Sequence, residues 1–283
     1  MKLYTEVSCE KLTTITRTDS VCVLGSCFAD EMGVRLSDAG FDVLRNPFGT
    51  LYNPASIASA VERLDSGAPF TPQDCVEMGA GAGRVCSFSH HTSFARPTAE
   101  EFLTDANARL KEDAARWRAC TYVILTLGTA WVWRATERPG TPIVANCLKR
   151  PAREFSHELL GVGDCEALLR GIVDGHPEKR FLITVSPIRH LGEGAHANTI
   201  SKSTLHLAVE KVLSSAQYFP AYEIVLDELR DYRFYAEDLV HPAPAAVQLV
   251  WERFLDACTD PADRERILSN ERAARAARHK SLF

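Results

Sequence analysis

The sequence has 283 residues, of which 46% are hydrophobic, and it carries a formal net charge of -5. A chain of this length and composition can bury the core of one α/β domain with insertions, and without a basic stripe it is not expected to bind nucleic acid. The first ten residues reach a charge too early for the apolar core of a signal peptide, and no apolar run approaches the ~18 residues of a membrane span. We therefore expect a cytoplasmic protein with no membrane partner.

Cysteine usage agrees with that compartment. The nine cysteines are an odd number and include no C-x-x-C pair, so they predict free thiols rather than disulfides. Most of them lie within apolar runs, which is typical of buried structural cysteines.

Five short apolar runs predict the strands of a sheet. Their hydrophobic residues are continuous rather than alternating, which is typical of strands that are covered on both faces. The runs occupy residues 21–25, 41–45, 121–127, 181–186 and 222–227.

Amphipathic segments lie between and after these strands. One begins at Thr98, which forms a capping box with Glu101, and continues with apolar residues at helical spacing. A second is predicted over residues 201–215, and a third begins at Pro242, a favourable first residue of a helix. The alternation of strands and helices predicts an α/β protein with a parallel sheet between two helix layers.

Two stretches are too long for ordinary connections. Residues 66–97 and 134–163 are therefore interpreted as insertions that form a lid over one end of the sheet. Residues 1–260 are interpreted as one domain, and the charged residues 261–283 as a solvated helical tail.

The stretch Gly25-Ser26-Cys27 stands where the first predicted strand ends and a helix begins. In a parallel sheet, ligands bind beyond the carboxyl ends of the strands, where helix N-termini favour developing negative charge. Ser26 is therefore a candidate nucleophile, and its alternative role is that of a helix N-cap. Cys27 is the rival nucleophile, because a thiol at a helix N-terminus can have a lowered pKa.

A matching acid and base stand near the other end of the chain. Asp238 and His241 are three residues apart, just before the last helix of the predicted domain, so both side chains can lie on one side of a tight turn. A histidine that deprotonates a serine needs a carboxylate on its second nitrogen, which selects the tautomer and stabilises the imidazolium. Asp238-x-x-His241 supplies that pair locally.

Six blocks, in order along the chain, carry a resemblance to a known family. They are VLGSCFADEMGVRL, NPFGTLYNP, LTLGTAWVW, VSPIRHL, SKSTL and DELRDYRFYAEDLVHP. Together they span roughly residues 20–255. The chain resembles the GSCFA family, a bacterial group named after the sequence Gly-Ser-Cys-Phe-Ala, which stands at residues 25–29 of this chain. A serine near the first strand with Asp-x-x-His near the last helix is also similar to the GDSL or SGNH hydrolases. The resemblance implies a three-layer, flavodoxin-like SGNH hydrolase fold.

The resemblance also implies roles for single residues. Ser26 would be the nucleophile, His241 the general base and Asp238 its orienting acid. The backbone N–H of Gly49, in the second block, would line the oxyanion hole together with that of Ser26.

Three positions depart from the expected patterns. Gly25 replaces the aspartate before the serine, Ala130 replaces the asparagine of the third SGNH block, and Leu148 stands where the GSCFA family is expected to have a histidine. A further oxyanion donor must then come from elsewhere, and the candidates are Asn53, Thr129 and Asn146.

Other polar residues are weaker candidates. His90 and His91 have no third ligand at a metal-like spacing, so no metal is predicted, and His91 is expected to line the pocket as a donor. Arg189 follows a predicted strand, where it either holds an anionic group of the substrate or forms a salt bridge within the loop. Lys202 and Ser203 are interpreted as capping and solvent-facing residues.

These observations predict an SGNH-type serine esterase without a cofactor. Its substrate would be a small-molecule or carbohydrate ester, with acetyl esters among the candidates, and the reaction would pass through an acyl-enzyme. Two alternatives stay open. One is an O-acyltransferase that uses the same three residues, and the other is a non-catalytic binding domain on the hydrolase fold. The sequence assigns no oligomeric state.

Overall fold

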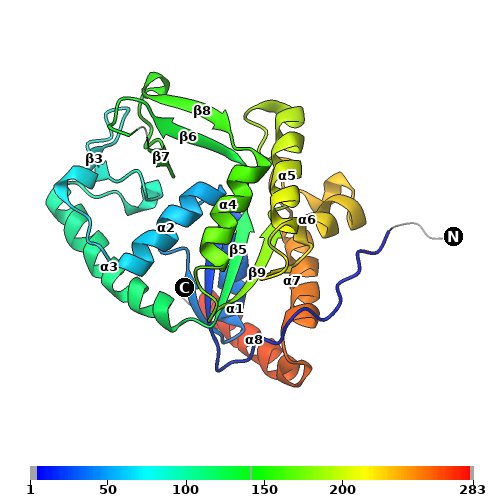
Figure 1. Cartoon of the computed structure of the whole chain (residues 1–283). Coiled ribbons are helices and arrows are strands. Elements are labelled where there is room, and N and C mark those ends of the chain that lie inside the picture. Colours follow the sequence, from blue (N-terminus) through cyan, green and yellow to red (C-terminus); the bar gives the residue numbers. More distant parts are fainter. Residues whose placement is uncertain (1–4, 141, 281–283) are drawn as a thin grey trace.

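The computed structural model describes residues 5–140 and 142–280. At its centre is a parallel sheet of five strands in the order β10-β9-β5-β1-β2 (Figure 1). The strands are β1 (Ser20–Gly25), β2 (Asp42–Arg45), β5 (Tyr122–Leu127), β9 (Arg180–Val185) and β10 (Gln217–Tyr218). Counted along the chain, this is the strand order of a flavodoxin-like, doubly wound sheet. The predicted α/β class is confirmed.

Helices cover both faces of the sheet, because its strands are apolar on both sides. In β1, Cys22 and Leu24 belong to one core cluster, whereas Val21 and Val23 belong to the other. The first cluster is covered by α2 (Pro54–Ser66), α3 (Ala99–Ala119), α4 (Val162–Val173) and α5 (Gly194–Glu210). The second is covered by α1 (Cys27–Asp38), α7 (Pro244–Cys258) and α8 (Arg264–Lys280).

The two predicted insertions contain small antiparallel sheets. The first holds β3 (Val76–Glu77) and β4 (Val85–Cys86), and the second holds β6 (Trp131–Ala135), β7 (Ile143–Val144) and β8 (Phe155–Leu159). Figure 1 shows β6 and β8 beyond the end of β5, beside the start of α5. An ion pair between His157 and Glu193, 3.2 Å long, joins β8 to the N-terminus of α5. That the insertions act as a lid stays a prediction.

Short helical turns complete the chain. They are η1 (Pro72–Asp74), η2 (Thr92–Phe94), η3 (Ala152–Glu154), α6 (Ala221–Glu223), the π-helical turn η4 (Ile224–Glu228), η5 (Tyr232–Phe234) and η6 (Pro261–Asp263). Within the described residues, no helix combines the length and the apolar character that crossing a membrane requires. All nine cysteines are free thiols, as predicted.

The last predicted strand is wrong. Residues 222–227 lie in the helical turns α6 and η4, and the fifth strand is instead β10, which pairs with Leu182 and Ile183 of β9. Ile224 and Val225 are buried, as the apolar run predicts, but the backbone is helical rather than extended. A short apolar run has no periodicity that separates a strand from a buried helical turn.

Two predicted helices begin at other residues than expected, and the predicted tail makes more contacts than expected. The helix predicted over residues 201–215 is α5, which begins at Gly194, and the helix predicted from Pro242 begins two residues later, at Pro244. The predicted tail is helical, as α8, and most of its residues are exposed, but it docks on the protein. In α8, Ile267 is fully buried, and Asn270 donates a hydrogen bond of 2.8 Å to the Ala39 carbonyl at the end of α1. The last three residues of the predicted tail lie outside the described residues.

Candidate active site

Ser26 lies at the junction of β1 and α1. The preceding Gly25 has a φ of 143°, and a Cβ on it would stand 2.1 Å from the Thr126 carbonyl oxygen, so the turn requires glycine. Ser26 donates its backbone N–H to that same carbonyl at 3.1 Å. Its Oγ accepts from the Phe28 N–H at 3.3 Å, so it caps α1. The helix directs its N-terminus to the space beyond the sheet, where an anion would be favoured.

Asp238 and His241 form a hydrogen-bonded pair in the loop that precedes α7. The Oδ2 of Asp238 and Nδ1 of His241 are 2.6 Å apart. The other carboxylate oxygen accepts the backbone N–H groups of Val240 and His241, at 2.9 and 3.0 Å. These bonds, led by the two from backbone N–H groups, lower the pKa of Asp238 to about 2. The arrangement leaves Nε2 of His241 as the nitrogen that can receive a proton.

Arg189 anchors this loop to the carboxyl end of the sheet. Four residues after β9, its backbone N–H donates to the Val240 carbonyl at 3.2 Å, and its guanidinium donates to the Leu239 carbonyl at 3.1 Å. The guanidinium also lies 5.8 Å from the ring centroid of Tyr235. Among the described residues Arg189 forms no ion pair, so the expected loop salt bridge is replaced by bonds to main-chain carbonyls. Its binding of an anionic substrate group stays a prediction.

The serine and the histidine reach the same edge of the sheet without bonding to each other. Ser26 follows β1, and the His241 loop is attached just beyond β9, two strands away in the sheet. Ser26 is completely buried, whereas the His241 side chain is 46% exposed. In the described structure, the one hydrogen bond of the Ser26 hydroxyl is with Phe28 rather than with His241.

Both predicted backbone donors of the oxyanion hole are engaged in main-chain hydrogen bonds. The Ser26 N–H is bonded to Thr126, and the Gly49 N–H donates to the Asn46 carbonyl at 2.7 Å. Gly49 has a φ of 81°, and a Cβ on it would stand 2.4 Å from the Cβ of His91, so close packing of His91 accounts for this glycine. A role for either N–H at an oxyanion stays a prediction that requires these bonds to open.

The predicted side-chain donors have local partners. Asn53 caps α2, because its Oδ1 accepts from the Ser56 N–H at 2.8 Å. Asn146 accepts from the Leu148 N–H at 2.8 Å. These two bonds use the side-chain oxygens, and each explains an asparagine at its position by local structure.

Thr129 and His91 also have structural partners. The Thr129 hydroxyl is 2.9 Å from the Ser201 hydroxyl and accepts from the Trp131 N–H at 3.1 Å. His91 caps η2, with its Nδ1 accepting from the Ser93 N–H at 3.3 Å. Their contact with substrate stays a prediction.

Lys202 is buried rather than solvent-facing, which corrects the prediction for it. Its Nζ donates to the Gly128 carbonyl at 2.6 Å and to the Ser186 carbonyl at 2.7 Å, so it ties the ends of β5 and β9 together. Burial lowers its pKa to about 7. Lys202 lies on the buried face of α5 together with Ser201, Leu205 and Val209, so the helical register turns it inward.

His190 also lies near Ser26, and the sequence alone predicts no role for it. Its backbone N–H donates to Asn198 Oδ1 at 2.9 Å, and its ring packs edge-on against Tyr52, with centroids 5.5 Å apart. The point where a Cβ on Gly128 would stand is 3.0 Å from His190 Nε2 and 3.4 Å from Ser26 Cβ. The usable signal was its position, because the VSPIRHL block follows a predicted strand and so reaches the edge where Ser26 lies.

His90, which precedes His91 in the chain, belongs to the core. It is 2% exposed, bonds through Nδ1 to the Ser87 hydroxyl at 2.7 Å, and lies among aromatic rings. These rings are Phe48, Phe70, Phe94 and Phe102. Burial, together with the positive charges of Arg63 and Arg109, lowers the pKa of His90 to about 3. No group of three or more His, Cys, Asp or Glu side chains in the described part of the chain is arranged to hold a metal ion.

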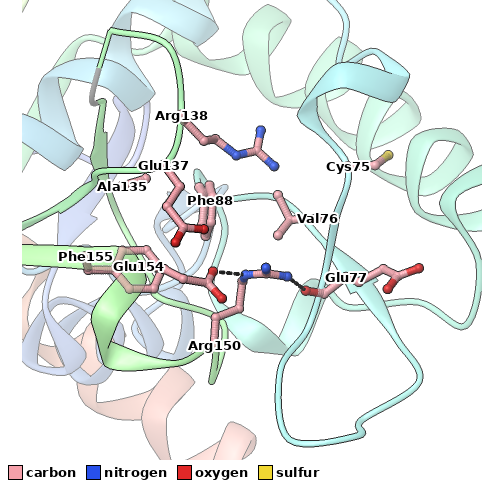
Figure 2. Close-up of a pocket in the computed structure, with 10 residues that line it drawn as sticks. All are labelled: Cys75, Val76, Glu77, Phe88, Ala135, Glu137, Arg138, Arg150, Glu154 and Phe155. Carbon is pink, nitrogen blue, oxygen red and sulfur yellow. Dashed lines mark hydrogen bonds and ion pairs between the residues drawn. The ribbon is translucent and has the colours of Figure 1, made fainter.

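A separate hollow of about 290 Å³ lies between the two insertions (Figure 2). Within it, Arg150 donates to Glu154 Oε2 at 2.5 Å and to the Glu77 carbonyl at 2.8 Å. Arg138 points into the same space, with its guanidinium 4.9 Å from the ring centroid of Phe88. None of the residues predicted for the active site lines this hollow. It is a feature of the insertions.

The fold and the position of the site define the class of the protein. It is a doubly wound α/β protein whose polar residues gather at the carboxyl edge of a parallel sheet, where such folds bind ligands. Residues 20–254 match the GSCFA family, so the chain belongs to the GSCFA family. The comparison with curated proteins finds no match.

Proposed function

We propose that this GSCFA protein is a serine ester hydrolase. Ser26 is its nucleophile, His241 its general base and Asp238 the carboxylate that orients the histidine. The substrate is an acyl ester, with acetylated carbohydrates in the substrate class. The observation that carries the proposal is the hydrogen-bonded Asp238–His241 pair, held by main-chain bonds at the same sheet edge as a serine that caps a helix.

The reaction proceeds through an acyl-enzyme. Oγ of Ser26 bonds to the carbonyl carbon while its proton passes to Nε2 of His241, and the carbonyl oxygen takes the electron pair. The bond to the alkoxy oxygen then breaks, and that oxygen leaves with the proton from His241. Water attacks the acyl-serine in the same way, gives one proton to His241, and the carboxylic acid departs as Ser26 recovers its proton.

The charge of Asp238 supports this division of roles. With a pKa of about 2, its carboxylate is ionised throughout the neutral range, so it can accept Nδ1–H and stabilise the imidazolium when His241 takes up a proton. Because Ser26 is buried and not bonded to His241 in the described structure, the reaction requires a movement that admits the ester and brings Nε2 to the hydroxyl.

Labelling and hydrolysis together test the proposal. A fluorophosphonate probe should modify Ser26 in the wild type, and Ser26→Ala should lower the hydrolysis of an aryl acetate by about 10³-fold or more. Cys27→Ala is the matched control, and it should stay within a few-fold of the wild type. Peptide mapping of the labelled protein identifies the modified residue. Full activity of Ser26→Ala would overturn the assignment.

A non-catalytic binding domain is the second candidate, favoured by the complete burial of Ser26. It predicts that neither the probe nor an ester reacts with the wild-type protein. Stoichiometric labelling at Ser26 excludes it.

A further inference from the structure

Neither main-chain N–H predicted for the oxyanion hole at Ser26 is free. The N–H groups of Ser26 and Gly49 are bonded to main-chain carbonyls, and position 130, where an SGNH enzyme has asparagine, is alanine. A tetrahedral intermediate needs at least one donor aimed at its negatively charged oxygen. Such a donor can come from a side chain that faces Ser26.

His190 is the polar side chain that faces Ser26 across Gly128. Its Nε2 and the Cβ of Ser26 both lie within 3.4 Å of the point where a Cβ on Gly128 would stand. Since Gly128 has no side chain, nothing of that residue fills the space. The Nε2 atom is buried and has no hydrogen-bond partner in the described part of the chain.

The position of His190 is held from several sides. Asn198 accepts its backbone N–H, and Tyr52 packs against its ring. The Tyr52 carbonyl in turn accepts the N–H groups of Gly128 and Thr129, both at 2.8 Å. The His190 ring, Tyr52, Gly128 and Ser26 thus form one packed arrangement, to which the first four blocks of the family resemblance each contribute a residue.

The ring is neutral at physiological pH. Burial, together with the nearby positive charges of Lys202 and His241, lowers the pKa of His190 to about 4. A neutral imidazole carries one N–H, and such an uncharged donor can stabilise an oxyanion without giving up its proton.

We propose that His190 is a catalytic residue that donates Nε2–H to the carbonyl oxygen of the ester as that oxygen becomes negatively charged. This inference rests on the proposed function of Ser26. His190 belongs to the fourth block, VSPIRHL, and supplies the side-chain donor that Ala130 lacks. No proton leaves His190 in any step, because His241 carries the protons of the reaction.

Three variants test this role with an aryl acetate as substrate. His190→Ala should lower kcat by about 10²- to 10³-fold while KM changes less than threefold, because the lost bond forms mainly in the transition state. His190→Gln, which restores a side-chain N–H donor, should recover at least about tenfold of that loss. His196→Ala is the matched control on the same segment, since His196 is exposed, and it should behave as the wild type.

A spectroscopic measurement keeps the test independent of variant stability. In wild-type protein with ¹⁵N-labelled histidine, the His190 Nε2–H resonance should shift when the fluorophosphonate probe modifies Ser26, because the phosphonyl oxygen occupies the oxyanion position. An unchanged resonance on modified protein would overturn the role of His190.

The outcomes separate the two proposals. If the wild type reacts and His190→Ala keeps kcat within threefold, the role of His190 is wrong and the serine esterase stands. If the wild type neither reacts with the probe nor hydrolyses the ester, both proposals are wrong. A loss of kcat in His190→Ala that His190→Gln partly restores supports both.

Discussion

A buried lysine lies at each end of the parallel sheet, and the two are satisfied differently. At the amino end, Lys179 donates to the carbonyls of Trp117 and Cys120, at 2.9 and 3.1 Å, where α3 ends. At the carboxyl end, Lys202 donates to the carbonyls of Gly128 and Ser186, in loops that follow β5 and β9. Lys179 meets the negative end of a helix dipole and the face of the Trp117 ring, 4.9 Å from its nitrogen, and it forms an ion pair of 3.6 Å with Glu178. Within the described residues Lys202 forms no ion pair.

The unpaired polar atoms follow the same division. Buried side-chain atoms without a partner in the described residues include several at the carboxyl end: Asn46 Nδ2, Thr126 Oγ1, Thr184 Oγ1 and His190 Nε2. Such groups are costly in a core, and proteins keep them chiefly where they act on something else. The comparison indicates that the carboxyl end carries buried polar groups beyond those that bond within the described fold.

The largest expected effect is on the pH dependence of the free energy of unfolding, to which Lys202 contributes. Because the pKa of Lys202 is lowered in the folded state, the unfolded chain binds more protons between about pH 7 and 10, and stability rises with pH across that window. The wild type should gain on the order of 4 kcal/mol from this residue between those limits, and Lys202→Met should lose that gain. Urea unfolding at several pH values measures it. If the free energies of unfolding of the two proteins changed with pH in parallel, the lowered pKa of Lys202 would be wrong.

Lys179→Met is the comparison at the other end. It leaves carbonyls at the end of α3 without their donor and should lower the free energy of unfolding by about 1–3 kcal/mol. Aryl ester hydrolysis should stay unchanged, because the residue is separated from Ser26 by the length of the strands. A selective loss of activity would show that the amino end also serves the reaction.

Gly128→Ala should have the next largest effect, and it acts on catalysis. The added methyl group would stand 3.0 Å from both His190 Nε2 and the Tyr52 carbonyl oxygen, and it would fill the space in front of Ser26. We expect kcat/KM to fall by about 100-fold, within the range of a lost oxyanion interaction. Gly171→Ala in α4 is the control, since its Cβ meets open space, and it should stabilise the protein by about 0.5–1 kcal/mol. Equal activity of the two variants would place the reaction elsewhere.

Arg189→Ala should have the smallest effect. It removes the guanidinium bond to the Leu239 carbonyl and the contact with Tyr235, while the backbone bond to Val240 remains. The Asp238–His241 loop should become less ordered, and kcat should fall by about tenfold with little change in Tm. The control is Arg233→Ala, because that side chain is 76% exposed near the same loop. A rise in KM for anionic esters alone would instead assign Arg189 to substrate binding.

Local signals were enough for much of the fold and for part of the candidate site. Thr98 accepts from the Glu101 N–H at 3.1 Å, as its capping position predicts, and Asp238 bonds His241 across a turn of three residues. In each case the partners are neighbours in the chain, so residue type and spacing decide the contact. Local signals did not predict the helical conformation of residues 222–227 or the burial of Lys202. Both depend on elements that lie far away in the sequence.

The sequence by itself determined the parallel α/β class, the serine at the end of the first strand and the acid–histidine pair, because apolar continuity, a glycine turn and a three-residue spacing are local properties. Only the tertiary structure decided that β10 is an edge strand of the sheet, that α8 docks on the end of α1 and that Lys202 joins two loops. It also decided that His190 faces Ser26 across Gly128. These relations join residues that are distant in the chain, and the packing of helices on the sheet brings them together.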